Sequence, residues 1–255
     1  MKEWLVKYKG WLIAAVAVIF VAVACTVALT CFRPQLASLY RSLRQSWLSM
    51  QTMPYRHYKD DDGKLVIYLD PGHGGTDPGA VSSYLGNETE ATINYRLAMK
   101  VKGYLEDYGY TVKLAWHEGI EPNQNGQYPY HERIARANAD PEADLYLCLH
   151  CNSFADSSVK GPRLYYNYEA TGYNHYLAES VADGIEDAHG GQRPRLYPLT
   201  KETAFHVMAT AEIPTILLEA LFVSNPEDAA MLLDDAWLTA EAEGIAQGVH
   251  KFVSD

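Results

Sequence analysis

LVIYLDPGHGG, residues 65–75, leads an apolar run directly into a turn that contains proline, three glycines and a histidine. The run is rich in β-branched, aliphatic and aromatic residues, a composition typical of a buried strand. Similar apolar runs recur at 111–116, 144–149, 163–168 and 214–219. Helical stretches lie between them. Strands that alternate with helices predict an α/β fold, with a mostly parallel twisted sheet and helices on both faces.

The expected helices follow from apolar residues at intervals of three and four. One helix carries Ile93, Leu97, Val101 and Leu105 and should stop at Gly109, since glycine is common just after a helix end. Further helices are expected at 131–139, 173–188, 227–233 and 237–253.

An uncharged run of 22 residues, 11–32 (WLIAAVAVIFVAVACTVALTCF), precedes this region. As a helix it would span about 33 Å, enough for a hydrocarbon core of about 30 Å. The run is longer than the apolar part of a cleaved signal peptide, about 7–15 residues. Lysines at positions 2, 7 and 9 favour a cytoplasmic location for residues 1–10. We therefore expect a single-pass anchor in the cell membrane, with the rest of the chain extracytoplasmic.

Residues 33–63 then read as a stalk or linker, and residues 64–255 as the globular domain. The boundary is marked by three aspartates and a glycine at 60–63. The domain holds 13 of the 21 basic and 28 of the 32 acidic side chains, a net charge of −15. Because nucleic-acid binding depends on neutralising phosphates, we expect no nucleic-acid partner.

Three polar residues follow or end predicted strands. His73 lies in the turn after the first strand, His150 directly follows strand 144–149, and Glu219 ends strand 214–219. Ligands of open α/β sheets bind outside the carboxyl ends of the strands. A carboxylate at the end of so apolar a strand is costly unless it is paired or near a metal. Histidines and carboxylates at one sheet edge favour a zinc site with a position left open for water.

Several motifs, in this order, resemble one family. DPGHGGTDPGA, the helix that begins near Glu90, LHCNSF and LLEALFVSNPEDAAML are similar to the zinc-dependent N-acetylmuramoyl-L-alanine amidases that hydrolyse bacterial cell walls. The resemblance covers about residues 64–253. It implies a mixed sheet, one zinc ion, and peptidoglycan as the substrate, cleaved at the amide between N-acetylmuramic acid and L-alanine.

The resemblance also implies roles for individual residues. His73 and His150 match two zinc ligands, and Glu219 matches the general base that acts on a zinc-bound water. The third ligand is a glutamate at the start of the first helix, where Glu88 and Glu90 compete. Two residues apart on one helix, they would point in nearly opposite directions. The register resembles that of the family at Glu90, and Glu88 is then a solvated charge near the helix N-terminus.

Other positions qualify this assignment. Leu221 stands where the family usually has glycine, and a leucine there could narrow the groove or change the backbone turn. Arg133 and Asn138 match a family helix and are expected to act as an internal polar brace. A membrane-tethered protein that binds peptidoglycan with weak or no activity is the main alternative, and a zinc hydrolase of another amide, such as a free muropeptide, is a second. Targeting would come from residues 11–32 or from unidentified protein regulators.

Overall fold

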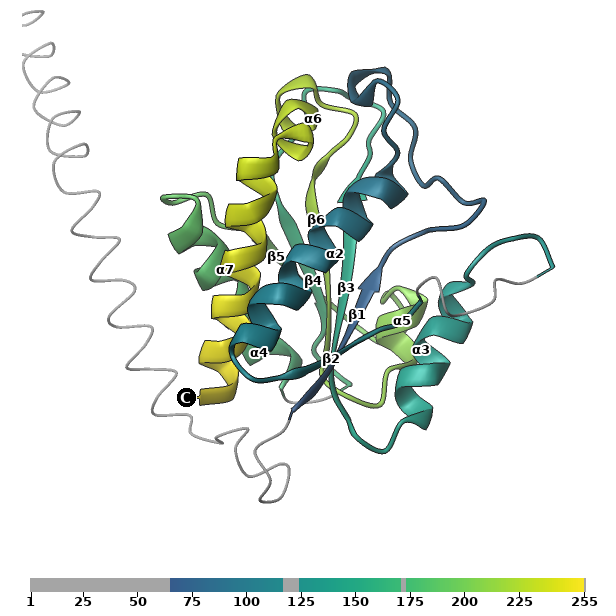
Figure 1. Ribbon diagram of the computed structural model, residues 1–255, viewed down its shortest axis with the longest axis vertical. Helices are drawn as coiled ribbons and strands as arrows, with labels where there is room; N and C mark the ends of the chain where they lie inside the picture. Colours follow the sequence, from purple (N-terminus) through teal and green to yellow (C-terminus); the bar gives the residue numbers. More distant parts are fainter. Residues whose placement is uncertain (1–64, 117–123, 171–172, 255) are drawn as a thin grey trace, which may run out of the picture. The chain divides into compact units, whose positions relative to one another are not determined.

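The computed structural model describes residues 65–116, 124–170 and 173–254 (Figure 1). The predicted N-terminus, anchor and stalk lie outside the described residues. Within the described ranges, no helix is both long enough and apolar enough to cross a bilayer.

The described part of the domain is built on a six-stranded sheet with strand order β2-β1-β3-β6-β4-β5. Strands β2, β1, β3 and β6 run parallel to one another, β4 is antiparallel to β6, and β5 is parallel to β4. The predicted mostly parallel sheet is therefore confirmed, with one antiparallel junction. The strands are β1 (Val66–Pro71), β2 (Thr111–Leu114), β3 (Ala143–Asn152), β4 (Arg163–Asn167), β5 (Arg195–Leu199) and β6 (Thr215–Phe222).

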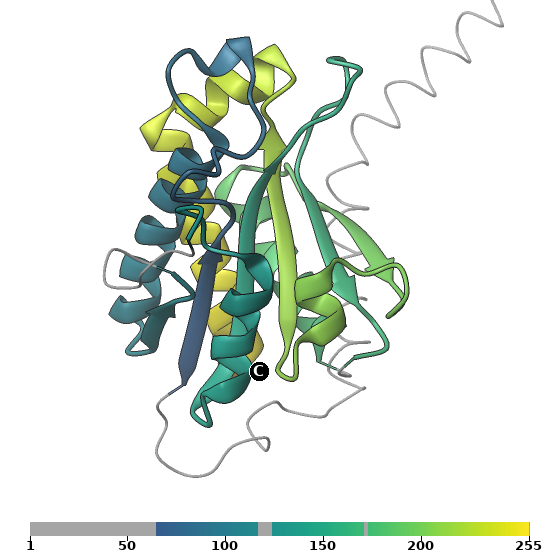
Figure 2. The same cartoon turned by 90° about the vertical axis from the view of Figure 1, so that its right-hand side faces the viewer.

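Helices cover both faces of the sheet, as predicted (Figures 1 and 2). Residues on β1 alternate between the faces: Ile67 and Leu69 join the core under α2, α4 and α7, whereas Val66 and Tyr68 join the core under α3 and α5. A short 3-10 helix, η2, and α6 pack against each other. The helices are η2 (Ser83–Leu85), α2 (Glu90–Asp107), α3 (Tyr130–Ala139), α4 (Asn174–Ala188), α5 (His206–Thr210), α6 (Pro226–Leu233) and α7 (Asp235–Ser254).

Local sequence explains where α2 begins and ends. Thr89 is its N-cap and forms a reciprocal capping box with Thr92. Gly109, with φ of 88°, follows the last turn, which confirms the predicted stop. The capping box makes Glu90 the first residue of α2. The N-terminus of α2, which is the positive end of its helix dipole, lies near the carboxyl ends of the strands.

The sequence patterns missed β5 and α5. β5 is an edge strand of five residues that contains Pro198, which an edge position tolerates because its outer side needs no hydrogen bond. α5 has five residues, too few to show a helical period.

Candidate metal centre

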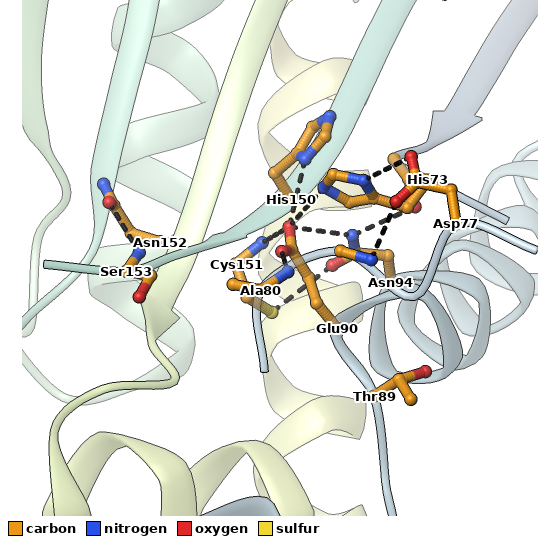
Figure 3. Close-up of polar contacts among 12 residues, drawn as sticks. His73, Asp77, Ala80, Thr89, Glu90, Asn94, His150, Cys151, Asn152 and Ser153 are labelled. Carbon is orange, nitrogen blue, oxygen red and sulfur yellow. Dashed lines mark hydrogen bonds and ion pairs between the residues drawn. The ribbon is translucent and has the colours of Figure 1, made fainter. Parts of the chain in front are cut away.

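Three of the predicted site residues converge at the carboxyl ends of β1 and β3 (Figure 3). His73 comes from the turn after β1, His150 from β3, and Glu90 from the start of α2. Oε1 of Glu90 lies 3.2 Å from Nε2 of His73 and 3.1 Å from Nδ1 of His150. One potential ligand atom from each residue lies within 4.8 Å of the others. Two imidazoles and one carboxylate therefore face a common point.

The backbone around His73 is under steric constraint. His73 has φ of 68°, the only positive φ of a non-glycine residue among those described. Gly72 lies so close to His150 that a Cβ there would come within 2.1 Å of the imidazole. A Cβ on Gly79 would lie 2.7 Å from both Glu90 and His73. The absence of a side chain at these two glycines thus leaves room for both imidazole rings and for the Glu90 carboxylate.

Arg133, on α3, holds the turn in this shape. Its Nη1 donates hydrogen bonds of 3.1 Å to the carbonyl oxygens of Pro71 and His73 and forms an ion pair of 3.1 Å with the buried Asp70. The predicted role as an internal brace is confirmed. Asn138 makes a corresponding contact further along α3, where its Nδ2 donates to the carbonyl oxygen of Thr210 at 2.9 Å. Arg133 is buried, and a buried charge is costly unless it is paired. The ion pair with Asp70 offsets this charge inside the protein.

Glu90 is almost fully enclosed, with 2% of its surface exposed. Its Oε2 accepts a hydrogen bond of 2.7 Å from the backbone N–H of Ala80, and its Oε1 accepts one of 3.2 Å from that of Cys151. Burial raises the pKa of this carboxyl, but the hydrogen bonds and charges of His150 and His73 outweigh burial and hold the pKa well below its usual range. Glu90 is therefore an ionised, preoriented carboxylate.

Glu88 is exposed and lies before the N-cap of α2. The assumption that both glutamates lie on one helix is wrong, because the helix begins at Glu90. The exposed position of Glu88 agrees with its predicted role as a solvated charge near the helix N-terminus.

Asp77 was not singled out from the sequence, although it follows His73 by four residues. Its Oδ2 lies 3.0 Å from Nδ1 of His73, which leaves Nε2 to face Glu90. A carboxylate on the outer nitrogen is the usual way in which a metal-binding histidine is oriented. Burial lowers the pKa of His73, but Glu90 and Asp77 together outweigh it and raise the pKa to about 9.

Glu219 lies beside this group on β6. In the register of the two parallel strands it pairs with His150, so the two side chains project from the same face of the sheet. Its buried Oε2 has no hydrogen-bond partner within the described part of the chain. Burial raises the pKa of this carboxyl to about 7, with a further contribution from the charge of Glu90 and opposing ones from His150 and His73.

Leu221 lies in a β-bulge. Between the pairs His150–Glu219 and Asn152–Phe222, β6 has one residue more than β3. The Leu221 side chain is fully buried, 0% exposed, in the core under α2, α4 and α7, and its φ is negative. Leucine therefore needs no strained backbone here, and its side chain is directed into the core.

The residues fit a zinc ion. Two histidines and one glutamate are a known set for catalytic zinc, which keeps its fourth position open. The donors converge without a fourth protein ligand among the described histidine, cysteine and acidic residues of the cluster. The buried, unpaired oxygen of Glu219 lies next to them.

Solved structures support the fold. The catalytic domain of CwlV, an N-acetylmuramoyl-L-alanine amidase from Bacillus (Paenibacillus) polymyxa var. colistinus, is 26% identical and superposes with a TM-score of 0.64 over 74% of this chain and 98% of that domain. The amidase AmiC2 of Nostoc punctiforme is 26% identical with a TM-score of 0.63, over 76% of this chain and all of that one.

Curated relatives point the same way. N-acetylmuramoyl-L-alanine amidase AmiC of Neisseria meningitidis serogroup B is 26% identical over 85% of this chain, and LytC of Bacillus subtilis is 31% identical over 73%. The matches span 60% of AmiC and 35% of LytC. The model of the Amidase_3 family, described as N-acetylmuramoyl-L-alanine amidase, matches residues 67–251. That range includes the sheet, except for Val66 at the start of β1, and all four predicted site residues, so this chain belongs to the Amidase_3 family.

Proposed function

We propose that this protein hydrolyses the amide bond between N-acetylmuramic acid and L-alanine in peptidoglycan. The observation that carries the proposal is the position of Glu219, next to His150 and with one buried oxygen unpaired. Membership of the Amidase_3 family supports both the bond and the substrate.

His73, Glu90 and His150 would hold one zinc ion. Bound zinc supplies Lewis-acid chemistry, making a water more acidic and polarising a carbonyl. Asp77 keeps the His73 ring in one orientation through Nδ1. The N–H groups of Ala80 and Cys151 hold the carboxylate of Glu90, so this ligand needs little reorganisation.

Glu219 moves the proton in this scheme. As a carboxylate it accepts a proton from the water that attacks the scissile carbonyl. It then donates that proton to the nitrogen of L-alanine, and the C–N bond breaks to leave a lactyl carboxylate and a free amine. Burial raises the pKa of this carboxyl toward the working pH, which suits both steps, since a group that titrates closer to that pH accepts and donates a proton with more similar ease.

The alternative of a binding protein with weak or no activity receives little support. It depended on Leu221, whose side chain lies in the core and whose backbone has an ordinary φ. A hydrolase of a different amide stays open, and the substrate experiment separates it from the proposal.

Digestion of purified peptidoglycan with the full-length chain tests the proposal. Mass spectrometry should detect stem peptides with a free L-alanine amino group, together with peptide-free glycan. The Glu219→Gln variant, loaded with zinc, is the control. Products that retain the muramic acid–alanine bond, or an absence of products, would contradict the assigned reaction, and cleavage of free muropeptides alone would favour the second alternative.

For its location, we propose that residues 11–32 anchor the protein in the cell membrane with the catalytic domain outside. The support is the uncharged 22-residue run behind three lysines. The 31-residue stalk would reach from about 46 Å as a helix to roughly 100 Å when extended, which limits hydrolysis to nearby peptidoglycan. Cell fractionation and protease treatment of spheroplasts test this. A shortened, soluble extracellular form as the main species would instead identify a cleaved signal.

A further inference from the structure

Two arginines continue the row that holds His150 and Glu219. Along one level of the sheet, His150 on β3 pairs with Glu219 on β6, Glu219 pairs with Arg163 on β4, and Arg163 pairs with Arg195 on β5. Paired residues project from the same face, and neighbouring strands lie about 4.8 Å apart. The backbone of Arg163 is therefore about 5 Å from that of Glu219, and the backbone of Arg195 about 10 Å away.

Both guanidinium groups stack on aromatic rings, which carry no charge that would neutralise them. Cζ of Arg163 lies 4.5 Å from the ring centre of Phe222 and 5.6 Å from that of Tyr197, and Cζ of Arg195 lies 5.0 Å from the Tyr197 ring. Neither guanidinium forms an ion pair with a carboxylate in the described ranges. Stacking leaves the N–H groups at the edge of a guanidinium available to a planar anion.

Both arginines also line a cavity of about 480 Å³. The other charged side chains that line it all have polar partners. Glu227 is paired with Lys160 at 2.5 Å. The carboxylate of Asp228 accepts hydrogen bonds from backbone N–H groups.

The third arginine of the cavity, Arg193, contacts three carboxylates on α4, those of Glu179, Asp183 and Glu186. Arg163 and Arg195 are thus the two arginines of this cavity that form no ion pair within the described ranges, in a domain whose net charge is −15.

The chemistry of the substrate indicates what binds here. N-acetylated sugars carry no charge, whereas a peptide carries carboxylates, at least at its C-terminus. An extended peptide advances about 3.4 Å per residue, so a carboxylate on its second or third residue lies about 7–10 Å from the scissile nitrogen. This range reaches the backbone spacing of about 10 Å between Glu219 and Arg195, and Arg163 lies between them, about 5 Å from Glu219.

We propose that Arg163 and Arg195 form a subsite for a carboxylate of the peptide that leaves when the amide is cleaved. The proposal rests on the proposed function and adds the direction of substrate binding: the peptide extends over β4 and β5. The arginines make the protein selective for stems whose carboxyl groups are free.

A pair of probes tests this with the full-length chain. One probe is an N-acetylglucosaminyl-N-acetylmuramoyl tripeptide with free carboxyl groups, and the other is the same compound with every carboxyl amidated. For the wild type we expect a KM at least about tenfold lower for the free acid, the effect of one hydrogen-bonded charge pair. Arg195→Gln should remove this preference by raising KM for the free acid, while kcat stays within about twofold. Arg163→Gln should also raise KM for the free acid, but it changes kcat as well, because the charge of Arg163 lowers the pKa of Glu219.

Lys102→Gln is the matched control, because it removes one positive charge from the C-terminal half of α2, at the opposite end of the helix from Glu90. Arg163→Lys should retain part of the preference. The Arg163 side chain stacks on the buried Phe222, so the Arg163→Gln variant could fail to fold. In that case the Arg195→Gln variant still tests the subsite, because Arg195 is exposed. Equal KM values for both probes with the wild type, or an equal loss on both probes in the variants, would overturn the subsite.

A binding measurement separates this proposal from the proposed function. Calorimetry with the free tripeptide and its amide needs no turnover. If the wild type cleaves neither probe yet prefers the free acid by about tenfold in Kd, the reaction is wrong and the subsite stands. Cleavage of both probes without any preference in KM or Kd would leave the reaction standing and refute the subsite.

Discussion

Glu219 on β6 lies directly across from His150 on β3, although 68 residues separate them in the chain. The two strands are parallel, so both side chains leave the same face at the same level of the sheet. This pairing places an acid–base group next to a candidate metal ligand. It also makes the function of either residue depend on the register of β3 and β6.

Replacement of Glu219 by glutamine should abolish most activity while fold and zinc content stay unchanged. The amide has nearly the same shape but accepts no proton from water. Acid–base assistance typically contributes about 10²–10⁴-fold, and we expect a loss of kcat in that range. Steady-state kinetics and metal analysis measure both quantities. A loss of less than about tenfold would mean that another group transfers the proton.

Activity should fall as the pH drops below neutrality. The general base must be ionised, and burial raises the pKa of Glu219 from 4.5 to about 7 in the absence of metal. A bound cation favours the carboxylate and lowers that pKa again. The acid limb of kcat/KM should therefore have its midpoint between these two values. A rate that does not change from about pH 4 to 8 would contradict a titrating base.

Glu90→Gln should weaken zinc binding, and Glu88→Gln should leave it nearly unchanged. The two changes are chemically identical, but Glu90 is enclosed between the histidines whereas Glu88 is exposed before the helix. Competition with a chromophoric chelator measures both affinities. The opposite order would show that Glu88 supplies the ligand.

One zinc ion should bind per chain, since His73, Glu90 and His150 form one three-ligand group. Removal with a chelator should abolish activity and lower Tm, because a ligand that binds only the folded state stabilises it. Readdition of stoichiometric zinc should restore both. Full activity in protein free of metal and insensitive to chelator would exclude the proposed chemistry.

Leu221→Ala should lower stability but not impair catalysis. The side chain is fully buried in the core, and loss of such a leucine typically costs about 2–5 kcal/mol. Denaturant unfolding measures the free energy, and kcat at a temperature where the variant is folded measures catalysis. A large rise in kcat would mean that the leucine restricts the active site.

The sequence predicted the positions of His73, His150 and Glu219 for a simple reason. Each follows or ends an apolar run, and the carboxyl ends of parallel strands meet at one edge of the sheet. The third candidate ligand needed more than the pattern, since Glu88 and Glu90 are two residues apart and equally acidic. The N-cap at Thr89 distinguishes them, because it starts the helix at Glu90 and leaves Glu88 outside.

Other parts of the site depend on contacts between distant segments. Asp77 contacts the imidazole of His73, whose backbone is left-handed, and Arg133 reaches the same turn from 60 residues away. Arg163 and Arg195 enter the row of Glu219 only because β4 pairs antiparallel with β6 and β5 joins at the edge. Local periodicity identifies a strand and its buried face. Which strand lies beside it, and in which register, is decided by burial and hydrogen bonding across the whole sheet, and short elements such as β5 acquire their structure only there.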